Sequence, residues 1–248
     1  MRQPLSVIII AKNEALQIRQ CLESVRWADE IVVLDSGSTD GTVAICQEYT
    51  DHVYQTDWPG FGEQKKRALA KATKPWVLSL DADEYLSDSL THAIQTILQT
   101  NSSHAGFEIT RKHLFYQKLI HHANGKKALL RLFKRESATI EPVSVHESFT
   151  VTGTVGHLAD PIIHQSFSDL SDMLTKLNRY SSLTAQQKIQ RGQHYNIAQS
   201  LLHAGWQFFK EYIINRGFLD GGRGFLLAWA YAHASFYRCV KTTYCDQA

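Results

Sequence analysis

The sequence contains few of the residues and spacings that mark several common protein classes. Its four cysteines, at positions 21, 46, 239 and 245 of 248 residues, form no CxxC pair. Such scattered cysteines suit neither a disulfide scaffold nor a zinc site, and we expect free thiols in a reducing compartment. Only 5 prolines and 14 glycines are present, which excludes collagen-like and low-complexity sequence.

Long apolar stretches and a charge excess are missing as well. The longest uncharged, apolar-rich stretch covers residues 225–237, whereas a membrane-spanning helix needs about 20 residues. The first residues lack the apolar stretch and cleavage site of a signal peptide. The chain has 26 basic and 24 acidic residues and no nucleic-acid reader motif. We therefore expect a cytoplasmic protein that does not cross a membrane and binds no nucleic acid.

Nucleotide-binding glycine loops are a third absence. A dinucleotide-binding dehydrogenase would place GxGxxG directly after its first strand. Residues 11–14 instead read AKNE, and no P-loop of the form GxxxxGK[ST] occurs. Any bound nucleotide must therefore be held by side chains and a metal rather than by a glycine cradle.

What the sequence does contain is a regular alternation of strand-like and helical patterns over its first hundred residues. Strands are predicted at residues 5–10, 31–34, 52–55 and 76–80, with helical patterns between them. This spacing is typical of a parallel sheet that is covered by helices on both faces.

The pattern changes after about residue 104 and becomes helical from about residue 168. Shorter strands are predicted at residues 106–111, 129–133 and 148–151. We therefore expect an α/β protein with a catalytic domain at 1–165, made of a nucleotide half at 1–104 and an acceptor half at 105–165, and a helical C-terminal extension at 166–248.

Three polar loops follow predicted strands, at residues 11–14, 35–42 and 81–84. Ligands of open α/β sheets bind at the carboxyl ends of the strands, so these loops form the expected site. Asp81 and Asp83 are separated by one residue and could together face a divalent cation and a ribose. The alternative is a solvated turn that caps the next helix, since a DxD pattern often occurs by chance.

Four motifs occur in a fixed order: LSVIIIAKNE, VVLDSGSTDGT, FGEQKKRALAKA and WVLSLDADE. In this order and spacing, residues 4–100 resemble the inverting family 2 glycosyltransferases of the GT-A fold. The narrower likeness is to bacterial lipopolysaccharide-core glucosyltransferases that add β-1,4-linked glucose to heptose. It extends through the VHE sequence at 145–147 and through residues 216–221. The resemblance implies a GT-A-type, Rossmann-like mixed sheet, mainly parallel and flanked by helices.

The resemblance also implies the substrates and the cofactor. The expected donor is a UDP-sugar, above all UDP-glucose, and the expected acceptor is a lipopolysaccharide inner-core heptose at the cytoplasmic face of the inner membrane. The expected cofactor is Mg²⁺ or Mn²⁺. Two alternatives remain: a GT-A enzyme with another nucleotide sugar or glycan acceptor, and a nucleotide- or glycan-binding protein without catalysis. The sequence predicts no oligomeric state.

Roles in nucleotide binding follow from the same resemblance. Glu14 would contact the nucleoside, Asp35 the uracil edge, and Asp81 the ribose or a metal-bound water. Lys65 and Arg67 are candidates to approach the diphosphate, or else belong to an ordinary solvated helix face. The residues expected at the nucleotide are Ala11, Asn13, Glu14, Asp35, Ser36, Lys65, Arg67, Asp81 and Ala82.

The metal and the catalytic base are assigned in the same way. Asp83 would bind the metal that bridges the two phosphates. His164 could reach the metal or the diphosphate, although a lone histidine is more often a core or surface residue. An inverting transfer needs a carboxylate that deprotonates the attacking hydroxyl. Glu147 is the predicted base and Glu141 the rival, the alternative being that Glu147 is a surface acid beside a strand.

Two surface features complete the prediction. Residues 111–135 carry eight lysines and arginines and no acid, which predicts either a solvated hairpin or a surface for polyanions such as a phosphorylated lipid acceptor or an anionic leaflet. Residues 201–244 are rich in aromatic residues with interspersed basic ones. These helices could pack on the catalytic domain or a partner, or bind peripherally to the inner membrane.

Overall fold

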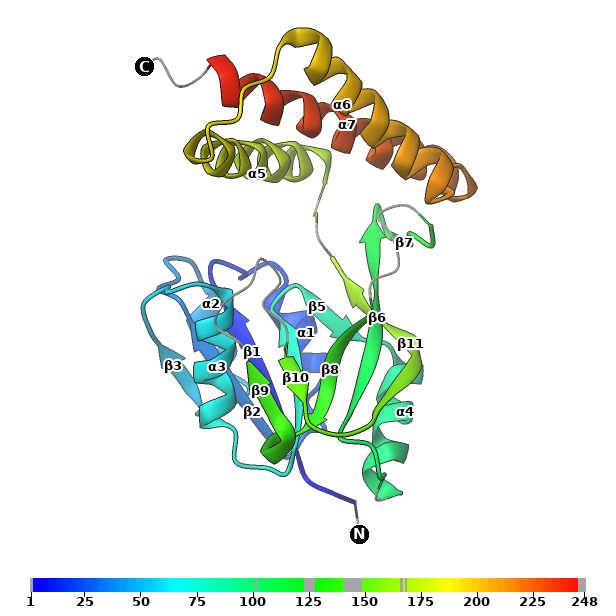
Figure 1. The fold of residues 1–248 in the computed structure, drawn as a ribbon. Coiled ribbons are helices and arrows are strands. Elements are labelled where there is room, and N and C mark those ends of the chain that lie inside the picture. Colours follow the sequence, from blue (N-terminus) through cyan, green and yellow to red (C-terminus); the bar gives the residue numbers. More distant parts are fainter. Residues whose placement is uncertain are drawn as a thin grey trace. The chain divides into compact units, whose positions relative to one another are not determined.

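The computed structural model describes residues 2–100, 102–122, 128–140, 149–165, 167 and 169–244. The chain forms two compact units. The first comprises residues 1–112 and 127–165, and the second comprises residues 113–126 and 166–248 (Figure 1). A sheet organises the first unit and helices organise the second.

The sheet of the first unit is mixed. Its strand order is β3-β2-β1-β4-β8-β6-β11-β5. Strands β3, β2, β1 and β4 are parallel, whereas β8 is antiparallel to β4 and β6, and β11 is antiparallel to β5. The strands are β1 (Leu5–Ala11), β2 (Glu30–Asp35), β3 (Val53–Gln55), β4 (Trp76–Asp81), β5 (Glu84–Leu86), β6 (Gly106–Phe115), β8 (Ala128–Lys134) and β11 (Val155–His164). The short helix η1 (Arg135–Ser137) leads into a separate hairpin of β9 (Ala138–Ile140) and β10 (Phe149–Val151).

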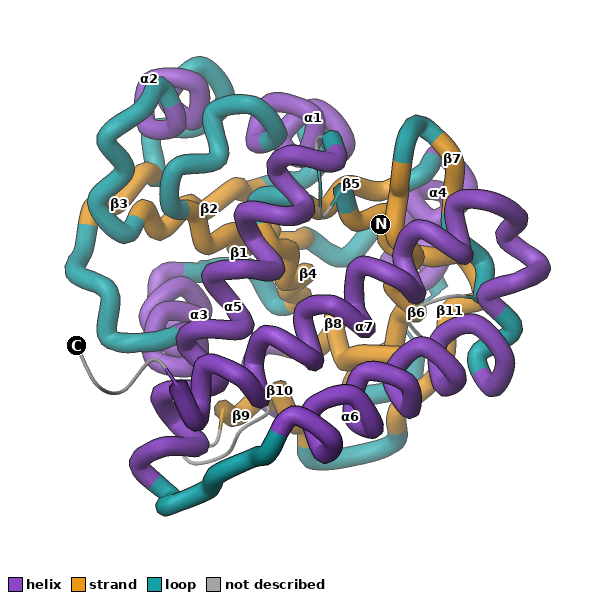
Figure 2. The backbone as a smooth tube through the Cα atoms, turned by 90° about the horizontal axis from the view of Figure 1, so that it is seen from above, coloured by secondary structure: helices purple, strands orange, loops and turns teal. Residues whose placement is uncertain are grey.

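Helices cover both faces of the parallel strands because those strands are apolar on both sides. All seven residues of β1 are buried. Val7 and Ile9 belong to the core that α1 and α4 complete, whereas Ile8 and Ile10 belong to the core that Ala68 of α3 completes. Figure 2 shows α1 and α2 on one side of these strands and α3 on the other. The helices are α1 (Ile18–Ser24), α2 (Thr42–Gln47), α3 (Phe61–Lys71) and α4 (Asp88–Gln99).

This architecture confirms the expected GT-A-type fold class, a mixed sheet flanked by helices and followed by a helical C-terminal region. Strands β5 and β11 lie outside the sequence prediction. Strand β11 reads VGHLADPIIH and is mostly half-buried or exposed, so it lacks the continuous apolar run of the central strands. Helix α1 begins at Ile18, and Asn13 in the loop before it adopts a positive φ of 56°.

The second unit consists of helices and one short hairpin. Its core contains Phe115 and Ile120 of the hairpin, together with Met173 and Leu177 of α5 and Leu227 of α7. This packing explains why residues 113–126 belong with the helices, a grouping that the sequence pattern does not reveal. The elements are β7 (Lys118–Leu119), α5 (Leu170–Gln190), α6 (Ile197–Phe209), the π-helical turn η2 (Lys210–Ile214), η3 (Gly217–Asp220) and α7 (Gly221–Tyr244).

Two expectations drawn from composition can be compared with the described residues. Cys21, Cys46 and Cys239 are free and buried, and burial raises the pKa of the Cys46 thiol to about 12. Cys245 lies outside the described residues. In the described part of the chain, every helix is too short or too polar to cross a membrane.

Candidate active site

Three strand ends meet at one edge of the sheet. Ala11 at the end of β1 lies opposite Asp35 of β2, and Ile10 lies opposite Asp81 of β4. Because these strands are parallel, their carboxyl ends coincide and the loops that follow them lie together. The structure therefore gathers the three polar loops on which the site prediction depends.

The loops after β1 and β2 are joined through Asn13. Its Oδ1 accepts the backbone N–H of Thr39 at 2.8 Å, and its own N–H donates to Ser38 Oγ at 2.8 Å. The N–H of Glu14 donates to Thr42 Oγ1 at 2.8 Å. The predicted nucleotide residues Asn13 and Glu14 are thus held in place by the loop after β2.

Asp35 orders that second loop from within. Its Oδ2 accepts the N–H groups of Gly37 at 3.0 Å and Ser38 at 2.8 Å, and its Oδ1 accepts the Ser38 hydroxyl. Asp35 is 1% exposed. The neighbouring Ser36 Oγ accepts a hydrogen bond from Gln64 Nε2 at 2.8 Å. These bonds fix the backbone of the loop at the edge where a nucleoside is expected.

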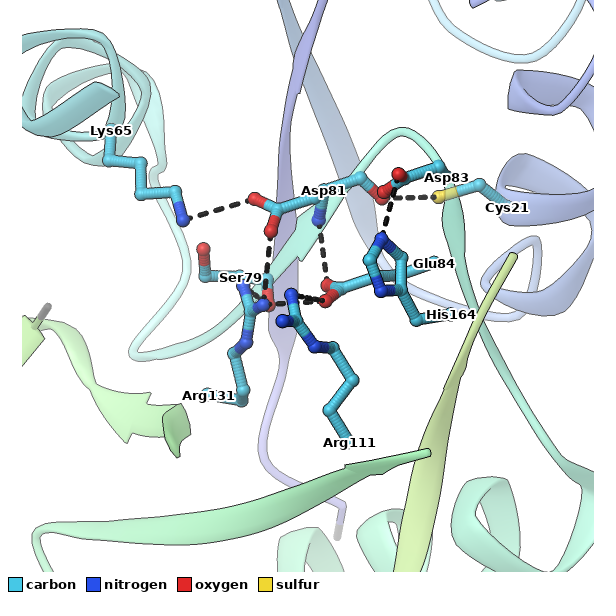
Figure 3. Close-up of polar contacts among 9 residues, drawn as sticks. All are labelled: Cys21, Lys65, Ser79, Asp81, Asp83, Glu84, Arg111, Arg131 and His164. Atoms are coloured by element: carbon cyan, nitrogen blue, oxygen red, sulfur yellow. Dashed lines mark hydrogen bonds and ion pairs between the residues drawn. The ribbon is translucent and has the colours of Figure 1, made fainter. Parts of the chain in front are cut away.

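Asp81 lies between two cations. Lys65 Nζ of α3 is 3.0 Å from its Oδ1, and an Arg131 guanidinium nitrogen of β8 is 3.1 Å from its Oδ2 (Figure 3). Burial penalises the ionised carboxylate, but the charges of Arg131 and Lys65 outweigh this penalty and hold the pKa of Asp81 well below its usual value. Asp81 is therefore a fixed anion with an oriented side chain.

Glu84 is the buried anchor of this cluster. It is 0% exposed, and Arg131 approaches its Oε1 at 2.7 Å while Arg111 lies 3.5 Å away. Its Oε2 accepts the backbone N–H of Asp81 at 3.0 Å. Burial raises the pKa of Glu84 above its usual value although Arg131 opposes the shift. Glu84 and Arg131 together fix both the backbone and the carboxylate of Asp81.

Arg131 and Glu84 belong to the candidate site, although the motif analysis gives neither of them a role there. A signal for Arg131 does exist, because it is a single charge within the otherwise apolar stretch ALLRLF of β8. A charged residue that is 4% exposed requires a buried partner. Nothing in the sequence alone identifies that partner as Glu84.

Asp83 and His164 come together although 81 residues separate them. His164 Nε2 is 2.8 Å from Asp83 Oδ2 (Figure 3). Strand pairing explains this contact, because His164 at the end of β11 lies opposite Glu84 of β5. The side chains of His164 and Asp83 remain 13% and 22% exposed.

This pair fits a cation that a diphosphate would help to bind. The described residues contain no group of three or more histidine, cysteine, aspartate or glutamate side chains able to enclose a metal. Asp83 and His164 supply one carboxylate and one imidazole, and Mg²⁺ or Mn²⁺ commonly combines one or two protein ligands with substrate phosphates. The donor set is thus that of an open site and not of a closed structural site.

Two further predicted nucleotide residues lie nearby with different surroundings. Ala82 is 4% exposed in the turn between Asp81 and Asp83. Arg67 does not join the cluster around Asp81, because its guanidinium lies 2.6 Å from Asp57 and 3.6 Å from Glu63 on α3. Of the two basic candidates, Lys65 is therefore the one that contacts the strand-end carboxylates.

The predicted base Glu147 and its rival Glu141 lie outside the described residues. The assignment of the base therefore remains a sequence prediction.

In an α/β sheet of this kind, ligands bind at the carboxyl ends of the parallel strands, where these anchored carboxylates lie. The chain matches the family model described as "Glycosyl transferase family 2" over residues 6–147. This match covers more than half of the chain, and the protein belongs to that family.

Individual relatives agree with the family match. The chain is 30% identical over 247 residues to "Lipopolysaccharide core biosynthesis glycosyltransferase LpsC" of Rhizobium meliloti, covering 96% of this chain and 91% of that protein. It is 30% identical over 259 residues to an "Uncharacterized glycosyltransferase" of Rickettsia felis, covering 96% and 89%. The crystal structure of S. aureus TarS 1–349 with UDP-GlcNAc covers 97% of this chain and 81% of that chain, with 17% identity and a TM-score of 0.49. The protein is therefore a glycosyltransferase.

Proposed function

We propose that the protein is a metal-dependent, inverting hexosyltransferase that moves glucose from UDP-glucose to a heptose of the lipopolysaccharide inner core. The observation that carries the proposal is the convergence of Asp83 and His164 beside the Lys65–Asp81–Arg131 cluster. The relative named as a lipopolysaccharide core glycosyltransferase supports the choice of acceptor. The expected setting is the cytoplasmic face of the inner membrane, where that acceptor would be presented.

The three loops would bind the nucleotide. Asp35 and Ser36 would face the uracil and Glu14 the nucleoside, next to the backbone of Ala11 and Asn13. The fixed anion of Asp81 would accept hydrogen bonds from the ribose hydroxyls. Lys65 lies beside Asp81 and has a cationic head group that can also attract the diphosphate.

Asp83 and His164 would hold Mg²⁺ or Mn²⁺ between the protein and the diphosphate. The ion would supply positive charge that neutralises the leaving nucleoside diphosphate. His164 would supply an imidazole nitrogen, and its contact with Asp83 keeps both ligand groups on the same side of the site.

Glu147 would remove the proton from the acceptor hydroxyl as its oxygen attacks the anomeric carbon of the sugar. The C–O bond to the diphosphate breaks from the opposite face, which inverts the anomeric configuration. Such a base typically contributes about 10²–10⁴-fold to the rate. Glu141 is the rival for this role.

A transfer assay tests the proposal. The full chain is incubated with Mn²⁺ and heptose-terminated lipopolysaccharide core. UDP-glucose, UDP-galactose or UDP-GlcNAc is added in separate reactions, and the mass of the product is measured by mass spectrometry. The proposal predicts the gain of one hexose from UDP-glucose and its loss in Glu147→Gln. Transfer from another donor would replace the sugar assignment, and retained transfer in Glu147→Gln would direct attention to Glu141.

A further inference from the structure

Helix α6 of the second unit has its polar and apolar sides reversed. Ser200 is 0% exposed, and Glu211 in the turn that follows is 5% exposed. By contrast, Leu202 is 74% exposed, Trp206 58% and Phe209 47%. These apolar residues recur at intervals of three and four and thus form one side of the helix. A contiguous exposed apolar side of this kind marks a surface for a partner or a membrane.

The inward polar side is well satisfied, so the reversal is part of the fold. Glu211 accepts hydrogen bonds from Gln207 Nε2 at 3.1 Å and from Asn215 Nδ2 at 3.0 Å. Gln207 lines a small cavity together with Ser181 of α5 and Ser235 of α7. The buried polar groups on this side therefore have hydrogen-bond partners, as buried polar groups in stable folds normally do.

Helix α7 adds a second exposed apolar strip next to the first. Phe225, Leu226 and Trp229 are 43%, 42% and 52% exposed. Phe208 of α6 contacts the rings of Phe225 and Trp229 at centroid distances of 5.8 and 6.1 Å. Figure 2 shows α6 and α7 running side by side. The two strips therefore adjoin, and we call them the α6–α7 face: Leu202, Trp206, Phe209, Phe225, Leu226 and Trp229.

The charge of this segment is mainly positive. Residues 191–244 contain six lysines and arginines but only two acids, Glu211 and Asp220. Both acids have partners, since Asp220 accepts the backbone N–H groups of His121 and His122, each at 2.9 Å. Lys210 and Arg216, which lie beyond the end of α6, are exposed. An apolar face with a basic border matches an anionic membrane surface.

We propose that the α6–α7 face lies in the interface of an anionic lipid membrane, with its leucines and aromatic rings at the acyl boundary and its basic side chains at the headgroups. Tryptophan is enriched at that depth because its ring is apolar and its N–H is polar. A second copy of the chain is a poorer occupant, because it would place two basic borders against each other. The proposal depends on the helices alone and holds whichever sugar is transferred.

Sedimentation with vesicles tests this surface without any nucleotide. The full chain is mixed with vesicles of phosphatidylethanolamine and phosphatidylglycerol or of phosphatidylcholine alone, and the bound fraction is measured. We expect binding to the anionic vesicles and a decrease of roughly tenfold or more in partitioning for the Leu202→Ser/Trp206→Ser double variant. Lys210→Gln/Arg216→Gln should reduce the preference for anionic lipid by roughly tenfold.

A matched control comes from the first unit. Leu16 is 91% exposed there, so Leu16→Ser removes an exposed leucine without touching the α6–α7 face and should bind vesicles like the native chain. The proposal is overturned if the native chain does not sediment with anionic vesicles, or if the double variant binds as well as the native chain. A dimer in solution that the double variant dissociates, without vesicle binding, would assign the face to a second copy instead. UDP binding is measured on the same samples to show whether the donor site is intact. A failure of vesicle binding can then be distinguished from a failure of the proposed activity.

Discussion

The two units use apolar and charged residues in opposite ways. In the first, β1 is buried along its whole length, and the charged residues Arg131 and Glu84 lie inside as partners. In the second, α6 buries Ser200 and exposes Leu202 and Trp206, and Glu211 is buried in the turn η2 that follows. The first unit therefore resembles an ordinary enzyme core around a fixed polar site, and the second resembles an element designed for contact with an apolar surface. Apolar residues thus form the core of the first unit, whereas many of those in the second unit are exposed.

The largest expected loss of stability comes from removing a buried charge of the first unit. Arg131→Met should leave Glu84 buried without its main cation and should cost about 3–5 kcal/mol of unfolding free energy. Urea denaturation measures this loss. Arg19→Gln is the matched control, because Arg19 pairs with Glu48 at 2.7 Å on the surface and both side chains are about half exposed. A stability loss no larger than that of the control would contradict the anchoring role of Arg131.

The next prediction compares one apolar residue from each unit. Ile9→Ala should cost about 2–5 kcal/mol, because Ile9 is 0% exposed in the core of the sheet. Leu202→Ala should change the unfolding free energy by no more than about 0.5 kcal/mol, because that side chain already contacts solvent. Denaturant titration of both variants in the absence of lipid checks the difference. Equal losses would show that Leu202 contributes to a core in solution.

The third prediction concerns ligand binding at the site. Lys65→Met removes one of the two cations beside Asp81 and should weaken UDP-sugar binding by about tenfold, since a charged hydrogen bond to the diphosphate is lost. Calorimetric titration measures the affinity. Lys71→Met on the same helix is the control, because Lys71 stacks over Tyr54 at 4.7 Å and does not contact Asp81. Equal affinities of the two variants would exclude Lys65 from the donor site.

The smallest expected effect is a pH dependence of the first unit. Burial opposes ionisation of Glu30, but hydrogen bonds from Ser6 and Thr73 lower its pKa below the unfolded value of 4.5. A carboxylate with a lowered folded pKa stabilises the fold above its unfolded pKa, and this contribution disappears as the pH falls through the folded pKa. Glu30→Gln should therefore lose about 1–2 kcal/mol at neutral pH and show a flatter decline in stability below about pH 5. Identical pH profiles for both proteins would contradict this assignment.

The parallel half of the sheet could be predicted because its strands are continuous apolar runs, such as the LSVIII of β1. Parallel strands place their ends at one edge, so the meeting of Asn13, Asp35 and Asp81 followed from pattern alone. The contact between Asp83 and His164 could not be predicted in this way. It depends on β11, the strand that carries His164. The sequence of β11 is partly polar and its residues are mostly half-buried or exposed, so no apolar run marks it as a strand.

For the helical extension, the sequence does not predict which side of a helix faces the core. Periodicity identifies which residues of α6 share a side, but it does not state whether that side faces the core or the surroundings. Only the burial of Ser200 and Glu211 reveals the reversed orientation. The grouping of residues 113–126 with the helices likewise depends on long-range packing of Phe115 against Met173 and Leu177, which no local pattern encodes.

The proposed role of Asp83 is to couple a divalent cation to nucleotide binding. Isothermal titration of UDP into the native chain, Asp83→Asn and Asp51→Asn, each with and without Mn²⁺, measures this coupling. Asp51 is an exposed aspartate elsewhere in the first unit and serves as the control. We expect tight binding only with Mn²⁺ in the native chain and in Asp51→Asn, and its loss in Asp83→Asn. Binding of UDP that is equally tight without Mn²⁺, or unchanged in Asp83→Asn, would contradict it.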